Sequence, residues 1–449
     1  MPGVVGPDEI RRVAAAALEI PGADAVEVLF VHEWGGLTRF ASSSIHQSTS
    51  REDTDLSVRV VIGDRVGVAS TNDLSPDGAR RVADSAKEMA GVVAPDPLFP
   101  GLAPPNPVED SSRFDEGTAS TSPERRANGV ADLVGRLSNG LVAAGAFETI
   151  GMEVAVVNTE GQFCWAPTSR ASVTTVVTGA DGGTGFSEVF AASVDDVDAG
   201  TVGERAAGKA NASKNPRDVK PGRYTVVLEP SAVSTLVGFL AWIGFGGRQL
   251  VEGRSCLSGR HGEHVAADHV TMYDDARRAD TLGVPFDFEG VPRSHVSLIE
   301  GGVFRDGVYD LRTAKQAGKA TTGHALPPPN PEGPFPLNVV LEPGDASLED
   351  MISSTERGLL VTRFHYSNVV HPIESSITGM TRDGTFLIEN GEIAHPVKNL
   401  RFTQSILEAL QATTMIGKES ELASEFFFSA SLVPALKIES FNFSSTSDH

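Results

Sequence analysis

Residues 229–243, EPSAVSTLVGFLAWI, constrain the fold more than any other segment, because they carry no ionisable side chain after Glu229. Pro230 and Ser231 are typical of a helix start, and apolar residues follow on most of the helical surface. A helix that is apolar all round has to be buried. The segment therefore predicts a helix in the core of the C-terminal half of the chain.

The acidic balance of the chain limits what it can bind. It has 449 residues, with 37 basic and 59 acidic side chains and a formal net charge of −22. That charge repels phosphate groups and anionic lipids, so we expect binding to neither nucleic acid nor membranes. The opening residues lack the pattern of a secretory signal, and the two cysteines, Cys164 and Cys256, cannot form a disulfide framework. These features predict a soluble, cytoplasmic protein.

The first half of the chain combines helices with antiparallel strands. Periodicity predicts a helix at 7–18, strands at 25–31 and 37–41, a hairpin at 56–70 and a helix after Ser75. The helix-opening pair Ser75-Pro76 returns as Ser122-Pro123, and further strand patterns follow it. A helix with antiparallel strands thus occurs twice, which suggests an internal duplication.

Changes in composition divide the chain into five parts. Two stretches are rich in Pro and polar residues, which break regular structure. The predicted parts are an N-terminal α+β domain at 1–91, a Pro-rich connector at 92–121, a middle α+β segment at 122–213, a linker at 214–222 and a β-rich C-terminal domain at 223–449. Because helices and antiparallel strands occupy separate blocks, the fold class is α+β.

Closely spaced turn signals predict a three-stranded meander in the C-terminal domain. Asp383-Gly384 and Asn390-Gly391 are turn dipeptides on either side of an apolar Phe-Leu-Ile run. A proline at position 396 is expected to end the last of these strands, and a serine at position 405 to cap a closing helix.

The dipeptide His32-Glu33 is the first place where a metal site can be sought. A helical zinc site needs a second histidine about one turn later, where this chain has Gly36 and Leu37. The dipeptide also lies between two predicted strands. We therefore expect no metal there.

The densest group of possible metal ligands is formed by His261, His264 and His269. The neighbouring Gly259 and Gly262 favour a loop, and a metal site needs three or four ligands in fixed geometry. Surface histidines are the simpler interpretation. An enzyme that uses this group with another metal is kept as an alternative.

One short stretch combines four kinds of polar side chain, those of Arg363, His365, Tyr366 and Asn368. Such groups can hold a peptide through hydrogen bonds to its main chain and contacts with its apolar side chains. The other interpretation is an exposed strand with ordinary polar side chains. The residues alone leave both open.

From this stretch onward the chain resembles a known family. TRFHYSN, followed by TGMTRDGTFLIENGEIAHPVKNLRFTQSILEAL, is similar to the C-terminal sequence of the TldD/PmbA family, historically called modulators of DNA gyrase. The resemblance extends back through FDFEGVPRSHVSLIEGGVF, EGRSCLSGRHGEHVAADHVTMYDD and GRYTVVLEPSAV, and into the first half through TSREDTDLSVRVVIGDRVGVAS. It covers most of the chain and is thinnest at about residues 95–200.

The family that the chain resembles contains two kinds of subunit. One carries His-Glu-x-x-x-His on the helix after the first C-terminal strand, with a cysteine near the C-terminus completing a zinc site; the TldE/PmbA kind lacks these residues. Laid on this chain, the two histidines fall at about Gly238 and Ile243, and the glutamate at Phe239. None of these can bind zinc or act as a general base. The last cysteine, Cys256, lies far from the C-terminus.

The resemblance implies a non-zinc-binding subunit of the TldE/PmbA kind. Its expected partner is a TldD-like subunit that supplies the zinc of a heterodimeric cytoplasmic metallopeptidase, and its expected substrates are small unstructured peptides. This chain would shape the chamber and bind peptide, with Arg363, His365, Tyr366 and Asn368 as candidates for the surface that faces substrate or partner. We expect no catalytic residue and no cofactor in the chain itself. The alternative is a homodimeric peptide-binding or scaffold protein without a proteolytic role.

Overall fold

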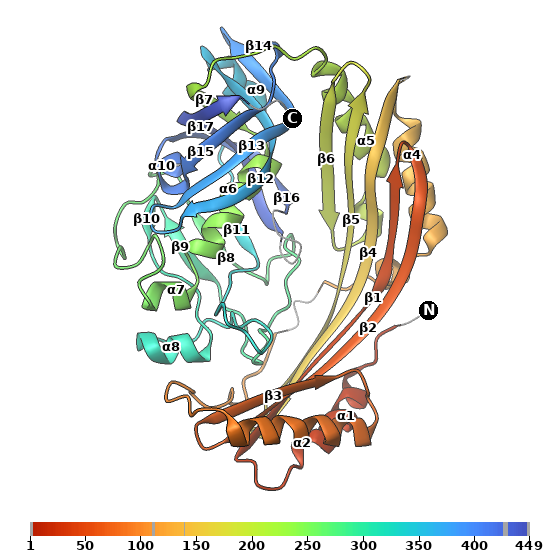
Figure 1. The fold of residues 1–449 in the computed structure, drawn as a ribbon, viewed down its shortest axis with the longest axis vertical. Helices are drawn as coiled ribbons and strands as arrows, with labels where there is room; N and C mark the ends of the chain where they lie inside the picture. Colours follow the sequence, from red (N-terminus) through yellow and green to blue (C-terminus); the bar gives the residue numbers. More distant parts are fainter. Residues whose placement is uncertain (1–2, 110–112, 139, 425–429, 447–449) are drawn as a thin grey trace.

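The computed structural model describes residues 3–109, 113–138, 140–424 and 430–446. Within these residues the chain forms two units, one built on a six-stranded antiparallel sheet and one on an eleven-stranded sheet (Figure 1). The first unit ends with helix α5, Ala199–Ala212, and the second begins with strand β7, Gly222–Leu228. The α+β class expected from the sequence is confirmed.

The six-stranded sheet repeats one arrangement twice. Its strand order is β3-β2-β1-β4-β5-β6, so the two halves meet where β1 pairs with β4. The first half contains α1 (Pro7–Leu18), β1 (Ala25–Ala41), β2 (Ser44–Ile62), β3 (Arg65–Thr71) and α2 (Pro76–Val92); the second contains α4 (Pro123–Gly135), β4 (Leu141–Asn158), β5 (Phe163–Gly179), β6 (Thr184–Ala191) and α5. Short α3 (Glu116–Ala119) and η1 (Val194–Asp196) lie outside the repeat. The order helix, three strands, helix thus occurs in both halves.

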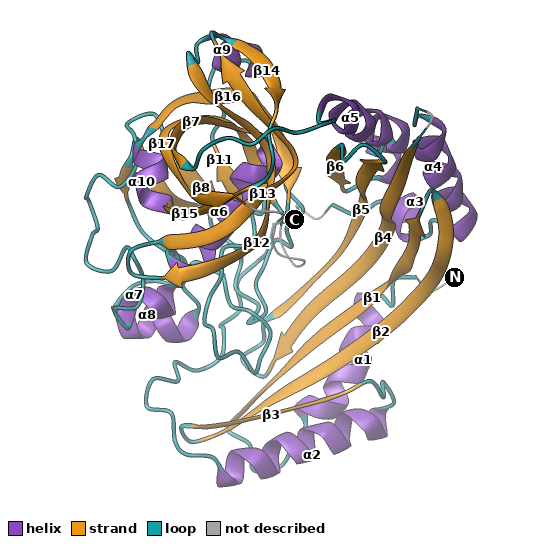
Figure 2. Cartoon of the chain, turned by 45° about the horizontal axis from the view of Figure 1, so that its top comes forward, coloured by secondary structure: helices purple, strands orange, loops and turns teal. Residues whose placement is uncertain are grey.

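The four long helices of this unit cover one face of the sheet (Figures 1 and 2). Even-numbered residues of β1 point to that face: Val28 and Phe30 pack in the core with α1 and α2, and Phe40 in the core with α4 and α5. Odd-numbered residues point the other way, and Leu29 packs there with Phe286 of the second unit. The face without helices is therefore the one that meets the second unit.

The prediction of two separate strands at 25–31 and 37–41 is wrong. Both belong to the single strand β1, which pairs with β2 and β4 along nearly its whole length and passes through His32 and Glu33. Close packing instead requires a glycine within the predicted gap at 32–36. A Cβ atom at Gly36 would lie 2.1 Å from Nη2 of the buried Arg126.

In the second unit five strands pair in a closed ring. β17 pairs with β15 and β7, β15 with β13, β13 with β12, and β12 with β7. Their bounds are β12 (Arg357–His371), β13 (Ser376–Glu389), β15 (Leu400–Ser405) and β17 (Ser431–Thr446). Aromatic rings fill the core, where the ring centroid of Phe364 lies 4.4 Å from that of Phe402 and 5.6 Å from that of Phe441.

Shorter elements complete the second unit. They are α6 (Pro230–Ile243), α7 (Gly247–Val251), β8 (Met272–Asp274), β9 (Val296–Glu300), β10 (Val303–Phe304), α8 (Leu311–Ala317), β11 (Val339–Leu341), α9 (Leu348–Ser353), β14 (Glu392–Pro396), α10 (Ile406–Gln411) and β16 (Thr413–Ala423). The apolar segment singled out from the sequence is α6, and the structure confirms it as a buried helix. Among the described helices, none is both long and apolar enough to cross a membrane.

The predicted meander is half right. Strand β13 runs straight through Asp383 and Gly384, whose φ angles of 55° and 124° mark an irregularity opposite β12 rather than a turn. Asn390 and Gly391 do form the turn to β14, which ends at Pro396 as expected. The helix capped at position 405 is α10, but it does not close the fold, because β16 and β17 follow it.

Candidate functional site

Helix α6 lies in the core of the second unit and packs against β12, β16 and β17. Its first turn also contacts the first unit. The side chain of Glu229 forms an ion pair with Lys209 of α5, and the Ser231 hydroxyl donates a hydrogen bond of 2.9 Å to Glu188 of β6. The start of the helix is thereby fixed relative to the six-stranded sheet.

The three α6 positions singled out from the sequence are packing positions. Gly238 is buried, and Phe239 and Ile243 are 2% and 6% exposed. Their side chains offer no lone pair to a metal ion, so zinc does not fit this face of the helix. The exposed residue of this helix is Trp242, at 41%.

The three histidines of the candidate ligand group lie in the loop between α7 and β8, as the glycines predicted. His261, His264 and His269 are all exposed, and Nδ1 of His264 lies 3.5 Å from the carboxylate of Asp268. In the part of the chain that the structure describes, no three His, Cys, Asp or Glu side chains are grouped so that they could hold a metal ion. These three histidines are surface residues.

Arg363 is held inside the contact between the two units. Its Nε donates a hydrogen bond of 2.7 Å to Oδ2 of Asp383, and its Nη2 donates to the same oxygen. The guanidinium also lies 4.1 Å above the ring of Phe186 in β6. This candidate therefore joins the two units in the isolated chain.

The other three candidates lie further along β12, nearer to solvent. Tyr366 is 74% exposed and adopts a φ of 51°, in the left-handed region that is costly for a residue with a side chain. Its ring centroid lies 4.6 Å from that of His365. Burial, and then the charges of Arg363 and Arg382, hold the pKa of His365 below its usual value. Asn368 is exposed.

A cavity of about 400 Å³ lies beside the start of α6, between β6, α5 and β16. It is rich in charge, but several of its ions are paired. Lys209 forms its ion pair with Glu229, and Arg205 Nη1 lies 3.1 Å from Glu421 Oε1. Both pairs run between the two units. Their arrangement suits adhesion between the units better than acid–base chemistry.

A buried acidic cluster was not predicted from the sequence. Nη1 of Arg59 in β2 lies 3.3 Å from Oε1 of Glu27 in β1 and 3.3 Å from Oε1 of Glu289 in the second unit. Burial raises the pKa of Glu27 to about 7 and that of Glu289 to about 8. One cation thus serves two carboxyl groups at the contact between the units.

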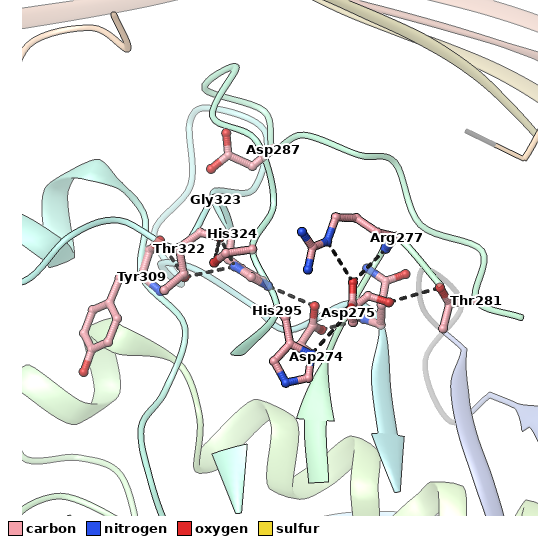
Figure 3. A network of polar contacts seen from close by, with 12 residues as sticks. Asp274, Asp275, Arg277, Thr281, Asp287, His295, Tyr309, Thr322, Gly323 and His324 are labelled. Atoms are coloured by element: carbon pink, nitrogen blue, oxygen red, sulfur yellow. Dashed lines mark hydrogen bonds and ion pairs between the residues drawn. The ribbon is translucent and has the colours of Figure 1, made fainter. Parts of the chain in front are cut away.

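A second buried network was also not predicted (Figure 3). His324 and Asp274 are fully buried, with 2.9 Å between Nε2 and Oδ1, and Nδ1 of His324 lies 2.9 Å from the carbonyl oxygen of Thr322. Beside it, His295 Nδ1 lies 3.3 Å from Oδ2 of Asp275. For the neighbouring cluster of Glu289, the available signal was the mixing of acids with apolar residues in FDFEGVPR, which is unusual for a surface loop.

Known proteins resemble this chain, some along nearly its whole length and some along about half of it. The solved structure of TldE from Thermococcus kodakarensis superposes with a TM-score of 0.86 at 23% identity, over 97% of this chain and 99% of that chain. Metalloprotease PmbA from Escherichia coli O157:H7 is 24% identical over 96% of each chain. A metalloprotease from Methanothermobacter thermautotrophicus is 27% identical over 50% of this chain and 48% of its own length.

Two descriptions of family domains match this sequence directly. Residues 221–445 match the PmbA/TldA metallopeptidase C-terminal domain, and residues 26–90 match PmbA/TldA metallopeptidase domain 1. The first match covers half of the chain, nearly all of the second unit from β7 to β17. The chain belongs to the PmbA/TldD metallopeptidase family.

Proposed function

We propose that this chain is the non-zinc-binding subunit of a two-component cytoplasmic metallopeptidase, in which a TldD-like partner supplies the zinc and the pair cleaves small unstructured peptides. The observation that carries the proposal is the ligand-free face of α6. Ionisable ligands in so apolar a core would be costly without a metal, whereas Gly238, Phe239 and Ile243 pack there without cost.

The contribution of this chain is to complete the chamber and to hold peptide. The far end of the β12–β13 hairpin supports this role, because it combines exposed apolar and polar side chains. Tyr366, Val370 and Ile373 are 74%, 55% and 49% exposed, and Asn368 lies among them. Clusters of this kind are typical of surfaces that receive a peptide or a partner.

The test is to purify the chain alone and together with a zinc-bearing sibling of the family. Mass spectrometry measures the zinc content of each preparation. A fluorogenic unstructured peptide measures its cleavage activity. We expect the pair to contain zinc and to cleave the peptide, and the chain alone to do neither. Stoichiometric zinc in the chain alone, lost in the His261→Ala/His264→Ala variant, would contradict the proposal.

Full activity of the sibling without this chain would also contradict it. A homodimer in light scattering, together with peptide binding but no gain of activity in the mixture, would favour the scaffold alternative instead. Both results come from the same preparations.

A further inference from the structure

A cavity of about 470 Å³ lies between the helix-free face of the six-stranded sheet and the second unit. Met152 of β4 and Thr168 of β5 line it from one side, and Phe288, Arg293 and Asn338 from the other. Its volume is within the range of pockets for small molecules or the end of a peptide. No residue of α6 lines this cavity, so it is separate from the helix on which the proposed function rests.

Arg293 is the unusual residue of this cavity. It is 3% exposed, and its Nε and Nη1 are buried without a hydrogen-bond partner among the described residues. A guanidinium stays charged in proteins, and leaving its donors unmet in the interior is costly. The described residues around Arg293 therefore supply no acceptor for these two nitrogens.

The two nearest acids do not supply that acceptor. The charges of Asp274 and Asp287 act on Arg293, but their oxygens already accept from other donors. These donors are the ring of His324 and the N–H of Asn338 for Asp274, at 2.9 and 2.7 Å, and the N–H groups of Glu289, Val291 and Ala325 for Asp287, at 3.0, 2.9 and 2.9 Å. Figure 3 shows Asp274 directed at His324. Both acids balance the charge of Arg293 without satisfying its hydrogen bonds.

Asn338 adds a second unmet donor to the same cavity. It is 4% exposed, and its Nδ2 has no partner within the described part of the chain. Its backbone is fixed, because its N–H donates to Asp274 and its carbonyl accepts from the N–H of Asp275 at 3.2 Å. Arg293 and Asn338 thus line one cavity, and each has a hydrogen-bond donor without a partner among the described residues.

The remaining charged side chains of the cavity form ion pairs, although Nε of Arg170 is also buried without a hydrogen-bond partner among the described residues. Arg51 forms an ion pair with Glu33, and Arg170 Nη2 lies 3.2 Å from Glu148 Oε2. The rest of the lining is mostly apolar, with Ile150, Met152, Val284, Phe288, Leu326 and Leu337. A ligand that fits has one anionic end and an apolar body.

We propose that this cavity binds a carboxylate carried on an apolar body, with the carboxylate on Arg293 and Asn338. A planar carboxylate offers two oxygens to such donors. A phosphate would bring a second charge into an apolar cavity near Asp274 and Asp287. The source that we favour is the C-terminal end of a peptide; this choice rests on the proposed function, whereas carboxylate binding itself does not.

The experiment measures binding to the purified chain by calorimetry with three probes: an apolar tripeptide with a free C-terminus, the same tripeptide amidated, and 4-phenylbutyrate. We expect the amide to bind about tenfold more weakly or worse, because it lacks the charge that Arg293 receives. Phenylbutyrate binding as tightly as the free tripeptide would assign the site to small acids. No zinc-bearing sibling is present, so failure of the peptidase proposal leaves this result unaffected.

Two variants locate the site. Arg293→Met is expected to lose about tenfold or more of the affinity, and Asn338→Ala a smaller part of it. Arg277→Met is the matched control, because Arg277 is exposed and does not line the cavity, and it should bind as the wild type does. Equal binding of the amide and the acid, unchanged binding by Arg293→Met, or no binding of any probe by the wild type overturns the proposal. The comparison of acid with amide decides the matter even where a variant fails to fold.

Discussion

Two aromatic residues of α6 differ in how far they are buried. Phe239 is 2% exposed in the main core of the second unit, and Trp242, one turn further on, is 41% exposed. The same helix therefore offers a buried and a half-exposed aromatic position for comparison.

Phe239→Glu is expected to lower the free energy of unfolding by at least about 3 kcal/mol, since it removes a core ring and buries an unpaired carboxylate. Trp242→Glu should cost clearly less, because its carboxylate can reach water. Urea unfolding followed by circular dichroism measures both. Equal losses would mean that this face of α6 is not the apolar packing surface described above.

The polar residues of β12 divide into one structural and one surface group. Arg363→Ala removes the hydrogen bonds to Asp383 and the contact with Phe186, and should lower the free energy of unfolding by about 2 kcal/mol. Tyr366→Ala should leave that energy within about 0.5 kcal/mol, because the ring is 74% exposed. In the reconstituted pair, Tyr366→Ala should instead lower kcat/KM for peptide cleavage. Unchanged kcat/KM would remove Tyr366 from the proposed peptide surface.

At the scale of elements, the two halves of the six-stranded sheet share a packing detail. A Cβ atom at Gly67 of β3 would lie 2.0 Å from the Ala86 carbonyl oxygen of α2. A Cβ atom at Gly185 of β6 would lie 2.1 Å from the Ala206 carbonyl oxygen of α5. In each half the third strand and the helix after it touch backbone to backbone, which only glycine permits.

Gly185→Ala should therefore destabilise the protein by about 2 kcal/mol or more, because α5 has to move away from β6. Gly208→Ala is the matched control on α5. It is exposed, and an added Cβ atom meets nothing within 4 Å. It should raise stability by about 0.5–1 kcal/mol through helix propensity. Thermal unfolding of the two variants decides, and a neutral Gly185→Ala would show that the strand and helix are less tightly packed.

Elements with local causes were predictable from the sequence, and those made by distant pairing were not. α1 follows from Pro7 and its acidic first turn, α2 from its Ser75 cap and its periodicity, and the β2–β3 hairpin from its turn. β1 was predicted as two strands, at 25–31 and 37–41, because nothing local shows that β2 and β4 flank it throughout. The ring closed by β7 and β17 joins strands some two hundred residues apart. Buried Arg293 was missed for a related reason: charged residues are usually exposed, and only the tertiary structure shows the exception.

At the scale of the whole molecule, the two units are joined by polar contacts near both ends of the sheet. Arg363 with Phe186 and Lys209 with Glu229 lie near β6, and Arg59 with Glu289 lies near β3. The last contact is the one that titrates near neutral pH. The carboxyl groups of Glu27 and Glu289 share the single guanidinium of Arg59.

The cluster makes stability depend on pH in a defined direction. Burial raises the pKa of Glu27 to about 7 and that of Glu289 to about 8, from the ordinary value of 4.5. The folded state therefore retains protons that the unfolded state releases as pH rises above 4.5. The stabilisation is complete below that value and is lost progressively as the pH rises from 4.5 through 7 and 8.

Urea unfolding between about pH 5 and about pH 9, a range that includes both pKa values, measures this loss at constant salt. Glu289→Gln removes one titrating group while keeping an amide for Arg59, so its stability should fall less steeply with pH. Glu160→Gln, in the exposed turn after β4, should keep the slope of the wild type.

Because Glu27 and Arg59 belong to one unit and Glu289 to the other, ionisation of the two carboxyl groups also weakens the contact between the units. We therefore expect a single thermal transition in acid to separate into two at alkaline pH, and to stay single in Glu289→Gln. Identical slopes in Glu289→Gln and the wild type would show that this cluster does not control the joining of the units.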